Sequence, residues 1–357
     1  MRVVVIGATG NIGTALLRRL SGDPDARVVG VARRRPPDTP PYDSVEAWHE
    51  IDIAEPTSAE LLRDAMTGAD AVVHLAWGFQ PSRDPAYLRR IGVDGSARVL
   101  DAAAASGVGH LVHTSSVGAY APKIDNRPVD ENYATSGITT SMYSRHKVLA
   151  ERHLDFYERT EPNGVQITRI RPGFVLQPDA GAALTRYGLP AYLPTQLITH
   201  LPLLPLDAKL IIPVVHSSDV ADAITRILDQ RATGPFNLAA DRPLNRDDIA
   251  RLIGAHPVNL PSKVLRATVS ATWHAHLQPL DAGWIDLAFA VPLMDTSRAR
   301  SVLGWRPVVA ADAALAVTVK AMSGGRGIDG SVLRPQSMFD EVQRLLREGP
   351  RGRRRLT

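Results

Sequence analysis

The chain has 357 residues, with 41 lysines and arginines against 37 aspartates and glutamates, and it has no cysteine. This length and a 44% share of hydrophobic residues suit one large or two ordinary globular domains, and the lack of cysteine excludes disulfides, iron–sulfur clusters and thiolate metal sites. The net charge of +4 equals that of residues 347–357 alone, which hold five arginines and one glutamate, so a basic face for nucleic acid is not expected elsewhere.

Neither a signal peptide nor a membrane span is expected. The apolar run at the N-terminus is short and ends in a glycine turn, unlike a signal peptide. No stretch reaches the roughly 18 uncharged apolar residues that span a bilayer, because prolines interrupt the longest candidate at 188–205. We therefore expect a cytoplasmic protein that does not contact a membrane.

Short β-branched runs alternate with alanine- and leucine-rich helical patterns from residue 1 to about 175. The expected strands are 2–7, 28–32, 71–76, 110–115 and 166–172. The expected helices are 10–20, 58–66, 86–105 and 141–157. Apolar strands separated by helices are typical of parallel βαβ units with helices on both faces of the sheet. The sequence therefore predicts an α/β fold, a doubly wound Rossmann sheet.

The pattern becomes proline-rich and irregular after Pro172. We expect a dinucleotide-binding domain over 1–175, to which a segment at about 210–240 returns, and a smaller interleaved substrate-binding lobe over 176–322. Residues 323–330 read SGGRGIDG, a composition typical of a flexible linker. An amphipathic helix at 337–347 and a basic tail are expected to complete the last segment, 323–357.

Three glycines separate the first expected strand from the first expected helix, in the sequence VVVIGATGNIGTALLRRL. Gly7 permits a tight turn, Gly10 lets the backbone approach a pyrophosphate, and Gly13 lets the helix pack closely on the strand. The helix N-terminus adds amide donors and the positive end of a dipole. A purely structural turn is the alternative, but the βαβ context favours a dinucleotide site. Its predicted members are Gly7, Thr9, Gly10, Asn11, Ile12 and Gly13.

The end of the second expected strand bears on which nucleotide is bound. NAD-preferring sites have an acidic residue there, which accepts hydrogen bonds from the ribose 2′-hydroxyl. Here the strand continues into Arg33 and Arg34, whose guanidinium groups suit a 2′-phosphate. The alternative is a solvated arginine loop, since two prolines follow at 36–37. We therefore favour NADP(H), and NAD(H) is possible.

Further motifs follow in a fixed order along residues 1–307. They are GATGNIG, Asp52-Ile53, His74-Leu75-Ala76, Thr114-Ser115-Ser116, YSRHK from Tyr143 to Lys147, Arg171-Pro172-Gly173, VHSSDVA at 215–221 and LGWRP at 303–307. Together they resemble the extended short-chain dehydrogenases/reductases, of the NAD-dependent epimerase/dehydratase family. The resemblance implies that Asp52 and Ile53 bind adenine. It further implies that Leu75 and Ala76 line the nicotinamide ribose and that Pro172, Gly173 and Phe174 close over the nicotinamide ring, with ordinary core packing as the alternative for Leu75, Ala76 and Phe174. Trp77 and Ser115 are also expected to bind the cofactor.

The catalytic residues expected from this resemblance are Ser116, Tyr143 and Lys147. Tyr143 and Lys147 are four residues apart on an expected helix, so they share one face. A tyrosine with a pKa of about 10 is a poor acid–base catalyst near pH 7 unless a charge such as a lysine ammonium stabilises its phenolate. Lys147 would also hold the nicotinamide ribose. Ser116 would bind the substrate oxygen, and Ser115 is the alternative if the register slips by one.

The sequence departs from the family pattern at two places that bear on which reaction is expected. Val117 and Gly118 stand where sugar-nucleotide dehydratases have Asp-Glu, which argues against water elimination. Gly92 stands where members commonly have asparagine, so the proton relay of that side chain is in doubt. No HExxH spacing and no GxSxG elbow occur, which argues against a metal site and against a hydrolase.

The expected substrate lobe begins with an apolar stretch, LPAYLPTQLITHLPLLPL at 189–206. Only Arg186 supplies a cation between Phe174 and Lys209, which favours a lipophilic carbonyl or alcohol over a pyrophosphate substrate. We predict an NAD(P)-dependent oxidoreductase. The alternatives are a nucleotide-sugar epimerase using transient oxidation and an NADP-sensing regulatory protein. Helices 86–105 and 141–157 correspond to those that pair in dimers of similar proteins, so a homodimer is expected.

Overall fold

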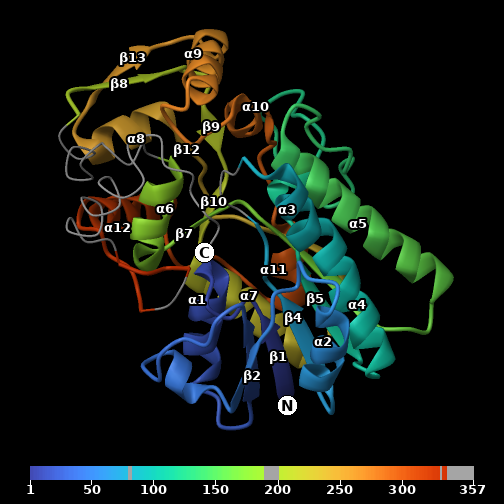
Figure 1. Ribbon diagram of the computed structural model, residues 1–357. Helices are drawn as coiled ribbons and strands as arrows, with labels where there is room; N and C mark the ends of the chain where they lie inside the picture. Colours follow the sequence, from blue (N-terminus) through green and yellow to red (C-terminus); the bar gives the residue numbers. More distant parts are fainter. Residues whose placement is uncertain (79–82, 189–200, 330–331, 336–357) are drawn as a thin grey trace.

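The computed structural model describes residues 1–78, 83–188, 201–329 and 332–335 (Figure 1). Its centre is a parallel sheet of seven strands in the order β11-β6-β5-β4-β1-β2-β3. These strands are β1 Arg2–Ile6, β2 Arg27–Ala32, β3 Ala47–Glu50, β4 Ala71–His74, β5 His110–Thr114, β6 Gln166–Pro172 and β11 Gly234–Leu238. The winding reverses between β1 and β4, and α/β sheets bind ligands outside the carboxyl ends of strands at such a point.

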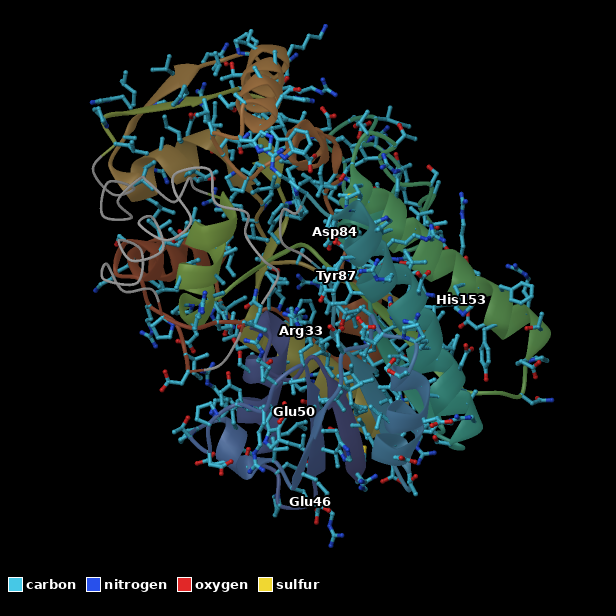
Figure 2. The ribbon with its side chains drawn as sticks, viewed as in Figure 1. Arg33, Glu46, Glu50, Asp84, Tyr87 and His153 are labelled. Atoms are coloured by element: carbon cyan, nitrogen blue, oxygen red, sulfur yellow. The ribbon has the colours of Figure 1, made fainter. Side chains whose placement is uncertain are left out.

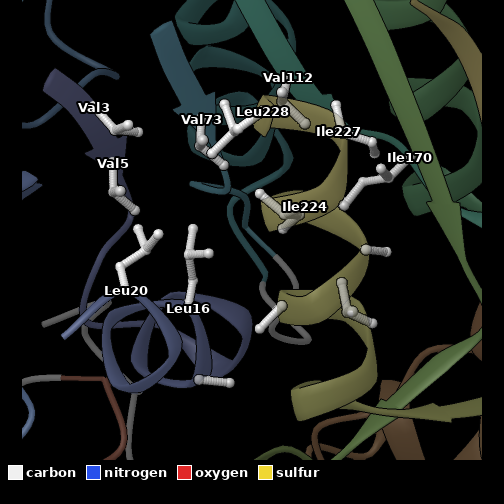
Figure 3. Close-up of a cluster of buried hydrophobic side chains, with 14 of the residues drawn as sticks. Val3, Val5, Leu16, Leu20, Val73, Val112, Ile170, Ile224, Ile227 and Leu228 are labelled. Atoms are coloured by element: carbon white, nitrogen blue, oxygen red, sulfur yellow. The ribbon is translucent and has the colours of Figure 1, made fainter. Parts of the chain in front are cut away.

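Helices cover both faces of this sheet. One face carries α1 (Asn11–Leu20), α7 (Ser217–Gln230) and α11 (Ser297–Leu303), and the other carries α2 (Ser58–Met66), α4 (Gly95–Ala105) and α5 (Met142–Thr160). Because side chains alternate along a strand, β1 contributes to both cores. Figure 3 shows its residues on the α1 and α7 side. The labelled residues there include Val3, Val5, Leu16, Leu20, Ile224 and Ile227.

The smaller lobe lies beyond the carboxyl ends of the central strands, where Figure 1 shows α8, α9, β8 and β13. Three two-stranded pairs form it and its junction with the sheet: β7 Phe174–Leu176 with β10 Val214–His216, β8 Leu203–Leu206 with β13 His256–Asn259, and β9 Ile211–Ile212 with β12 Leu244–Asn245. Its helices are α6 Gly181–Gly188, α8 Arg246–Ile253, α9 Ser262–His274, α10 Ala282–Ala290 and α12 Ala311–Ser323. Single 3₁₀ turns span Tyr42–Ser44, Val117–Ala119 and Pro178–Ala180.

The expected strands and helices of residues 1–175 are present, with two differences. The expected helix 86–105 is interrupted: α3 (Pro85–Arg89) leads into a π-helical turn over Arg90–Asp94, and α4 follows. The edge strand β3 was not among the expected strands, because it is half-exposed and has no β-branched residue. The α/β prediction of a doubly wound parallel sheet with an interleaved lobe is confirmed.

The segment after α12 differs from the flexible linker expected from its composition. Its Arg326 O accepts from Ala182 N of α6 at 2.9 Å, and within the segment Ile328 N donates to Leu333 O at 2.9 Å. The Arg326 guanidinium also pairs with Asp179 at 3.1 Å. The expected helix at 337–347 and the basic tail lie outside the described residues. Within the described ranges, no helix is long and apolar enough to cross a membrane.

Candidate active site

The turn between β1 and α1 leaves space for glycine alone at two positions. Gly7 has a left-handed φ of 86°, and a Cβ there would lie 2.7 Å from the backbone nitrogen of Ala76. A Cβ on Gly13 would lie 2.4 Å from the Gly7 carbonyl oxygen. The first turn of α1 begins after Gly10 and has no side-chain cap. Its amide groups therefore suit an anion, and the turn fits the pyrophosphate of a dinucleotide.

Two neighbouring residues of this turn contact the rest of the protein. The side-chain amide of Asn11 donates to Val175 O of β7 at 2.9 Å, and Gln177 Nε2 donates back to Asn11 O at 2.7 Å. Ile12 packs against the core between the sheet and α7, and Thr9 is buried. These contacts attach the phosphate-binding turn to the strand that follows Gly173.

Polar side chains gather at the carboxyl ends of β2 and β3. Arg33 directly follows β2, and its Nη1 donates to the Tyr87 hydroxyl at 2.9 Å; Figure 2 shows the two residues in the same region. Burial raises the pKa of Tyr87, although the Arg33 charge lowers it. The Asp52 carboxylate accepts from Ala54 N at 2.9 Å, and Ile53 is buried. Tyr87 was not predicted, because no local pattern relates it to β2.

The two arginines after Arg33 differ in their contacts. Arg34 is exposed. Arg35 is also exposed and pairs with Asp38 at 3.0 Å within the same loop. Arg33 is therefore the best placed of the three for a ligand at the sheet edge, because it lies nearest β2 and is half-buried.

Of the residues expected around the nicotinamide ring, Leu75, Ala76 and Phe174 are half-buried at the ends of β4 and β6, and Pro172 and Gly173 are buried. Leu75 N donates to Ile6 O at 2.8 Å, which extends the pairing of β4 with β1. A Cβ on Gly173 would lie 2.6 Å from Pro213 O, so this glycine permits close packing of two segments. Phe174 N donates to the same Pro213 oxygen at 2.8 Å. Leu75, Ala76, Pro172, Gly173 and Phe174 thus all help to join the strands at this edge.

Ser116, Tyr143 and Lys147 lie together where β5 meets α5. The hydroxyls of Ser116 and Tyr143 are hydrogen-bonded, and burial raises the pKa of Tyr143 to about 12. A Cβ on Gly118 would lie only 3.0 Å from the Tyr143 ring, so glycine allows this approach. The Lys147 ammonium donates to Thr114 O at 2.8 Å and lies 5.9 Å from the Tyr143 ring centroid. Burial lowers the pKa of Lys147 well below its usual range.

The side chain of Ser115 points away from Tyr143. Its hydroxyl donates to Glu151, which lies one helical turn beyond Lys147 and is 2% exposed. Glu151 also accepts from Arg171 at 2.8 and 2.6 Å. Burial raises the pKa of the Glu151 carboxyl, but Arg171 and Ser115 outweigh it, and the net pKa shift is downward. Ser115 is thus part of a buried polar network, and Ser116 is the serine that faces Tyr143.

This network also includes residues that the sequence analysis did not single out. Arg171 Nη1 donates to the Tyr120 hydroxyl at 3.1 Å, and that hydroxyl donates to Asn237 Oδ1 at 2.7 Å. The network therefore ties α5 to β6 and β11. Only Glu151 left a local signal, since it continues the four-residue spacing of Tyr143 and Lys147.

Two buried histidines lie close to Lys147. His74 of β4 and His113 of β5 are paired in register, with ring centroids 5.2 Å apart. His74 Nε2 is 2.9 Å from Ser96 Oγ, whereas neither ring nitrogen of His113 has a partner among the described residues. Burial, and then the charge of Lys147, lowers the pKa of His74 to about 3, and the pKa of His113 is also well below its ordinary value. Both rings are therefore neutral at physiological pH.

Aromatic rings surround Tyr143 and line a pocket. The Trp77 and Tyr143 rings lie edge to face with centroids 6.2 Å apart, and the Tyr143 and Trp284 centroids are 5.4 Å apart. Trp284, on α10, was not predicted, because it lies far along the chain from Tyr143. The pocket is lined by Trp77, Gly78, Leu88, Ser141, Met142, Tyr143, His146, Asp281 and Trp284. Most of the apolar stretch 189–206 that motivated a lipophilic substrate lies outside the described residues.

Gly92 packs against the indole of Trp77. A Cβ at this position would lie 3.0 Å from the ring, tighter than ordinary contact. Gly92 also lies in the π-helical turn that interrupts the expected helix. Glycine at this position, where the family resemblance implies asparagine, therefore makes room for an aromatic ring.

Among the described residues, no group of three or more histidine or acidic side chains could hold a metal ion.

Known proteins resemble this chain in sequence over most of its length. An uncharacterized protein of Mycobacterium tuberculosis (strain H37Rv) is 30% identical over 331 residues, or 92% of this chain, and the chain spans 31% of that protein's length. The UDP-glucose 4-epimerase of Mycolicibacterium smegmatis is 26% identical over 90% of this chain and 98% of its own length.

Solved structures are similar in fold. The Thermotoga maritima UDP-glucose 4-epimerase with UDP-glucose aligns with a TM-score of 0.68 at 19% identity, over 90% of this chain and 98% of that one. The Thermus thermophilus UDP-glucose 4-epimerase with NAD has a TM-score of 0.66 at 19% identity, over 91% and 99% of the two chains. The sequence model of the NAD dependent epimerase/dehydratase family matches residues 3–239, and the chain therefore belongs to this family of extended short-chain dehydrogenases/reductases.

Proposed function

We propose that this chain is an oxidoreductase that transfers hydride between a nicotinamide cofactor, preferably NADPH, and the carbonyl or alcohol carbon of a small lipophilic substrate. The observation that carries the proposal is the arrangement around Tyr143. Its hydroxyl is hydrogen-bonded to Ser116, Lys147 lies one helical turn away, and the ring forms part of an aromatic pocket.

The roles of the three residues follow from their chemistry. The bound nicotinamide supplies or accepts the hydride. In reduction, Tyr143 gives its proton to the carbonyl oxygen and takes one back from solvent, so that a ketone or aldehyde becomes an alcohol. Ser116 donates a hydrogen bond to the oxygen on which charge develops. Lys147 stabilises the phenolate that Tyr143 becomes and would hold the ribose hydroxyls.

The cofactor would lie across the carboxyl ends of β1 and β2. The turn through Gly7, Gly10 and Gly13 would hold its pyrophosphate, and Asp52 its adenine. Arg33 supports a preference for NADPH, because it follows β2 where an acidic residue would be needed for the free ribose. NAD is the cofactor named in several of the solved relatives, so the family itself does not decide between the two.

Binding titrations with both cofactors test this preference. Removing one charge-assisted contact to a phosphate weakens binding by roughly tenfold or more, so we expect Arg33→Ala to lose that much affinity for NADPH and little for NADH. Arg35→Ala is the matched control, since Arg35 pairs with Asp38 in the same loop. Tighter binding of NADH than NADPH by the unmodified protein would contradict the preference.

The substrate class is supported by the lining of the pocket. Trp77, Leu88, Met142 and Trp284 present apolar surface beside Tyr143. Ser141, His146 and Asp281 also line the pocket, and we take the apolar surface beside them to favour a small hydrophobic ligand with one polar group. The test is oxidation of NADPH with a panel of aromatic and aliphatic ketones and aldehydes, with Tyr143→Phe as the inactive control. If no carbonyl compound is reduced while a sugar nucleotide is converted, this substrate class is wrong.

A nucleotide-sugar epimerase is the second candidate. It is favoured by the mycolicibacterial UDP-glucose 4-epimerase, whose sequence this chain matches over nearly its whole length. The same tyrosine would then take the proton from a sugar hydroxyl while the bound nicotinamide takes the hydride from its carbon, and both would be returned with the hydride on the opposite face of the sugar ring. Conversion of UDP-glucose to UDP-galactose without net consumption of cofactor, followed by chromatography, distinguishes this activity from that of a reductase.

We also propose a homodimer through α4 and α5, the helices that pair in dimers of similar proteins. Phe156 supports this surface, because it is 58% exposed on α5. Light scattering should give a dimer mass for the unmodified protein and a monomer mass for Phe156→Glu. A monomeric unmodified protein would contradict the proposal.

A further inference from the structure

We propose that Trp77 is a positioning residue for Lys147: its indole face holds the lysine ammonium beside Tyr143, in the space that Gly92 leaves without a side chain. This inference deepens the proposed function, on which it rests, by naming Trp77 as the residue that supports the catalytic lysine.

The contact between Trp77 and Lys147 is close. The Lys147 nitrogen lies 3.4 Å from the centroid of the Trp77 ring, well within the range over which a cation is attracted to an aromatic face. The ammonium also donates to Thr114 O at 2.8 Å. Because an ammonium has three donors, these two contacts fix its direction and leave a further hydrogen for a ligand.

Trp77 is itself held by its neighbours. Its ring stands edge to face against Tyr143, with centroids 6.2 Å apart and an interplanar angle of 79°. On another side it meets Gly92, where even a Cβ would lie 3.0 Å from the ring. Glycine at residue 92 therefore lets the indole lie where it does, between the π-helical turn and α5, because a Cβ there would push the ring aside.

The charges around Lys147 make this aromatic contact important. Lys147 is 2% exposed, and burial disfavours its charged form. The nearby His74 and His113 are neutral, and the Glu151 charge is shared with Arg171. Water cannot solvate the ammonium, so the Trp77 face is one of the few groups that stabilise it.

Lysine-selective NMR on the cofactor-free protein tests the inference. The chain has five lysines, so protein labelled with ¹³C,¹⁵N-lysine gives five ε-methylene signals, and Lys147→Arg assigns the one of interest. We expect the Lys147 signal to be shifted upfield by the Trp77 ring current. In Trp77→Leu this upfield shift should disappear, and the pKa of Lys147 should fall by about one pH unit, as expected for loss of a desolvated cation–π contact.

Trp284→Leu is the matched control. It removes the other tryptophan that packs on Tyr143, but the Lys147 contacts with Trp77 and Thr114 stay intact. The Lys147 signal and titration should therefore be unchanged. Equal effects of Trp77→Leu and Trp284→Leu would mean that general loosening of the aromatic cluster is responsible, and the proposal would be wrong.

Gly92→Ala provides a second variant in case Trp77→Leu does not fold. The added methyl group displaces the Trp77 ring by a few tenths of an ångström without removing it, so we expect a smaller change of the Lys147 signal. Unchanged Lys147 signals in a folded Trp77→Leu protein, or in Gly92→Ala, would overturn the inference. The NMR measurement needs neither cofactor nor substrate. Failure of the proposed reductase activity would instead be detected by the NADPH oxidation assay with carbonyl compounds, so the two failures can be distinguished.

Discussion

The buried pair of His74 and His113 predicts a protein whose stability falls in mild acid. The pKa of His74 is lowered from about 6.5 to about 3, mainly by burial and then by the charge of Lys147. His74 therefore binds a proton below about pH 6.5 in the unfolded chain, but only near pH 3 in the folded protein. This histidine's contribution to stability is complete above pH 6.5 and is lost progressively as the pH falls between those values.

The magnitude follows from the size of the pKa difference. Each pH unit within that window costs about 1.4 kcal/mol for one such group, so His74 alone should lower the free energy of unfolding by about 3 kcal/mol between pH 7.5 and 4.5. His113, whose pKa is also lowered strongly, adds to this loss. Carboxylates that titrate in the same range contribute too, so the informative quantity is the difference between the unmodified protein and a variant.

His74→Gln is the suitable variant, since glutamine keeps a donor for Ser96 Oγ but does not titrate. Urea unfolding at several pH values, followed by tryptophan fluorescence, should show that the variant loses about 3 kcal/mol less than the unmodified protein over this range. His256→Gln, on the exposed strand β13, is the control and should behave like the unmodified protein. Parallel pH dependences for His74→Gln and the unmodified protein would refute the reasoning from burial.

Three other predictions concern the site and its supports. Tyr143→Phe should lower kcat by about 10²–10⁴-fold, while cofactor affinity, measured by fluorescence titration, should stay the same. Because burial raises the pKa of Tyr143 to about 12, kcat/KM for alcohol oxidation should rise with pH, and a flat profile would argue against Tyr143 as the base. Glu151→Gln should reduce the free energy of unfolding, measured by urea denaturation, by about 3–5 kcal/mol, because it leaves the buried Arg171 charge without its partner. Replacing both partners, with Glu151→Leu and Arg171→Met, should restore much of this stability, and a Glu151→Gln protein of unchanged stability would contradict the prediction. Gly13→Ala should abolish cofactor binding, because its Cβ would lie 2.4 Å from a backbone oxygen of the turn. Gly22→Ala is the control, since its Cβ would have no neighbour nearer than 3.8 Å, and equal cofactor binding by both variants would count against the pyrophosphate site.

The fold was predictable wherever a local pattern decides the structure. Strand β6 and helix α2 have the predicted bounds, 166–172 and 58–66, because one is an apolar run buried between helices and the other a clear amphipathic helix. Strand β3 was not predictable in this way, since its Ala-Trp-His-Glu sequence becomes a strand by pairing with β2. The π-helical turn over Arg90–Asp94 also escaped prediction, because one inserted residue barely alters helical periodicity.

The candidate site shows the same division between local and long-range information. Tyr143 and Lys147 could be predicted as neighbours because they lie on one helix, and the structure places them together. The choice between Ser115 and Ser116 could not be made from sequence spacing, since successive residues of a strand point to opposite sides. The choice depends on Glu151, which accepts a hydrogen bond from the Ser115 hydroxyl, so that Ser116 is the serine bonded to Tyr143.

The surroundings of Lys147 bear on the role proposed for its charge beside Tyr143. His74 and His113 are kept neutral by burial, and Glu151 is bound by Arg171 at 2.6 Å, so neither the histidines nor this carboxylate competes strongly for the ammonium. In the proposed reaction, the Lys147 charge would then act across a water-poor space on the phenolate that Tyr143 becomes, where electrostatic interactions are stronger than in water. The tyrosine–lysine spacing is a local feature of one helix, but its electrostatic effect depends on side chains from β4, β5 and β6.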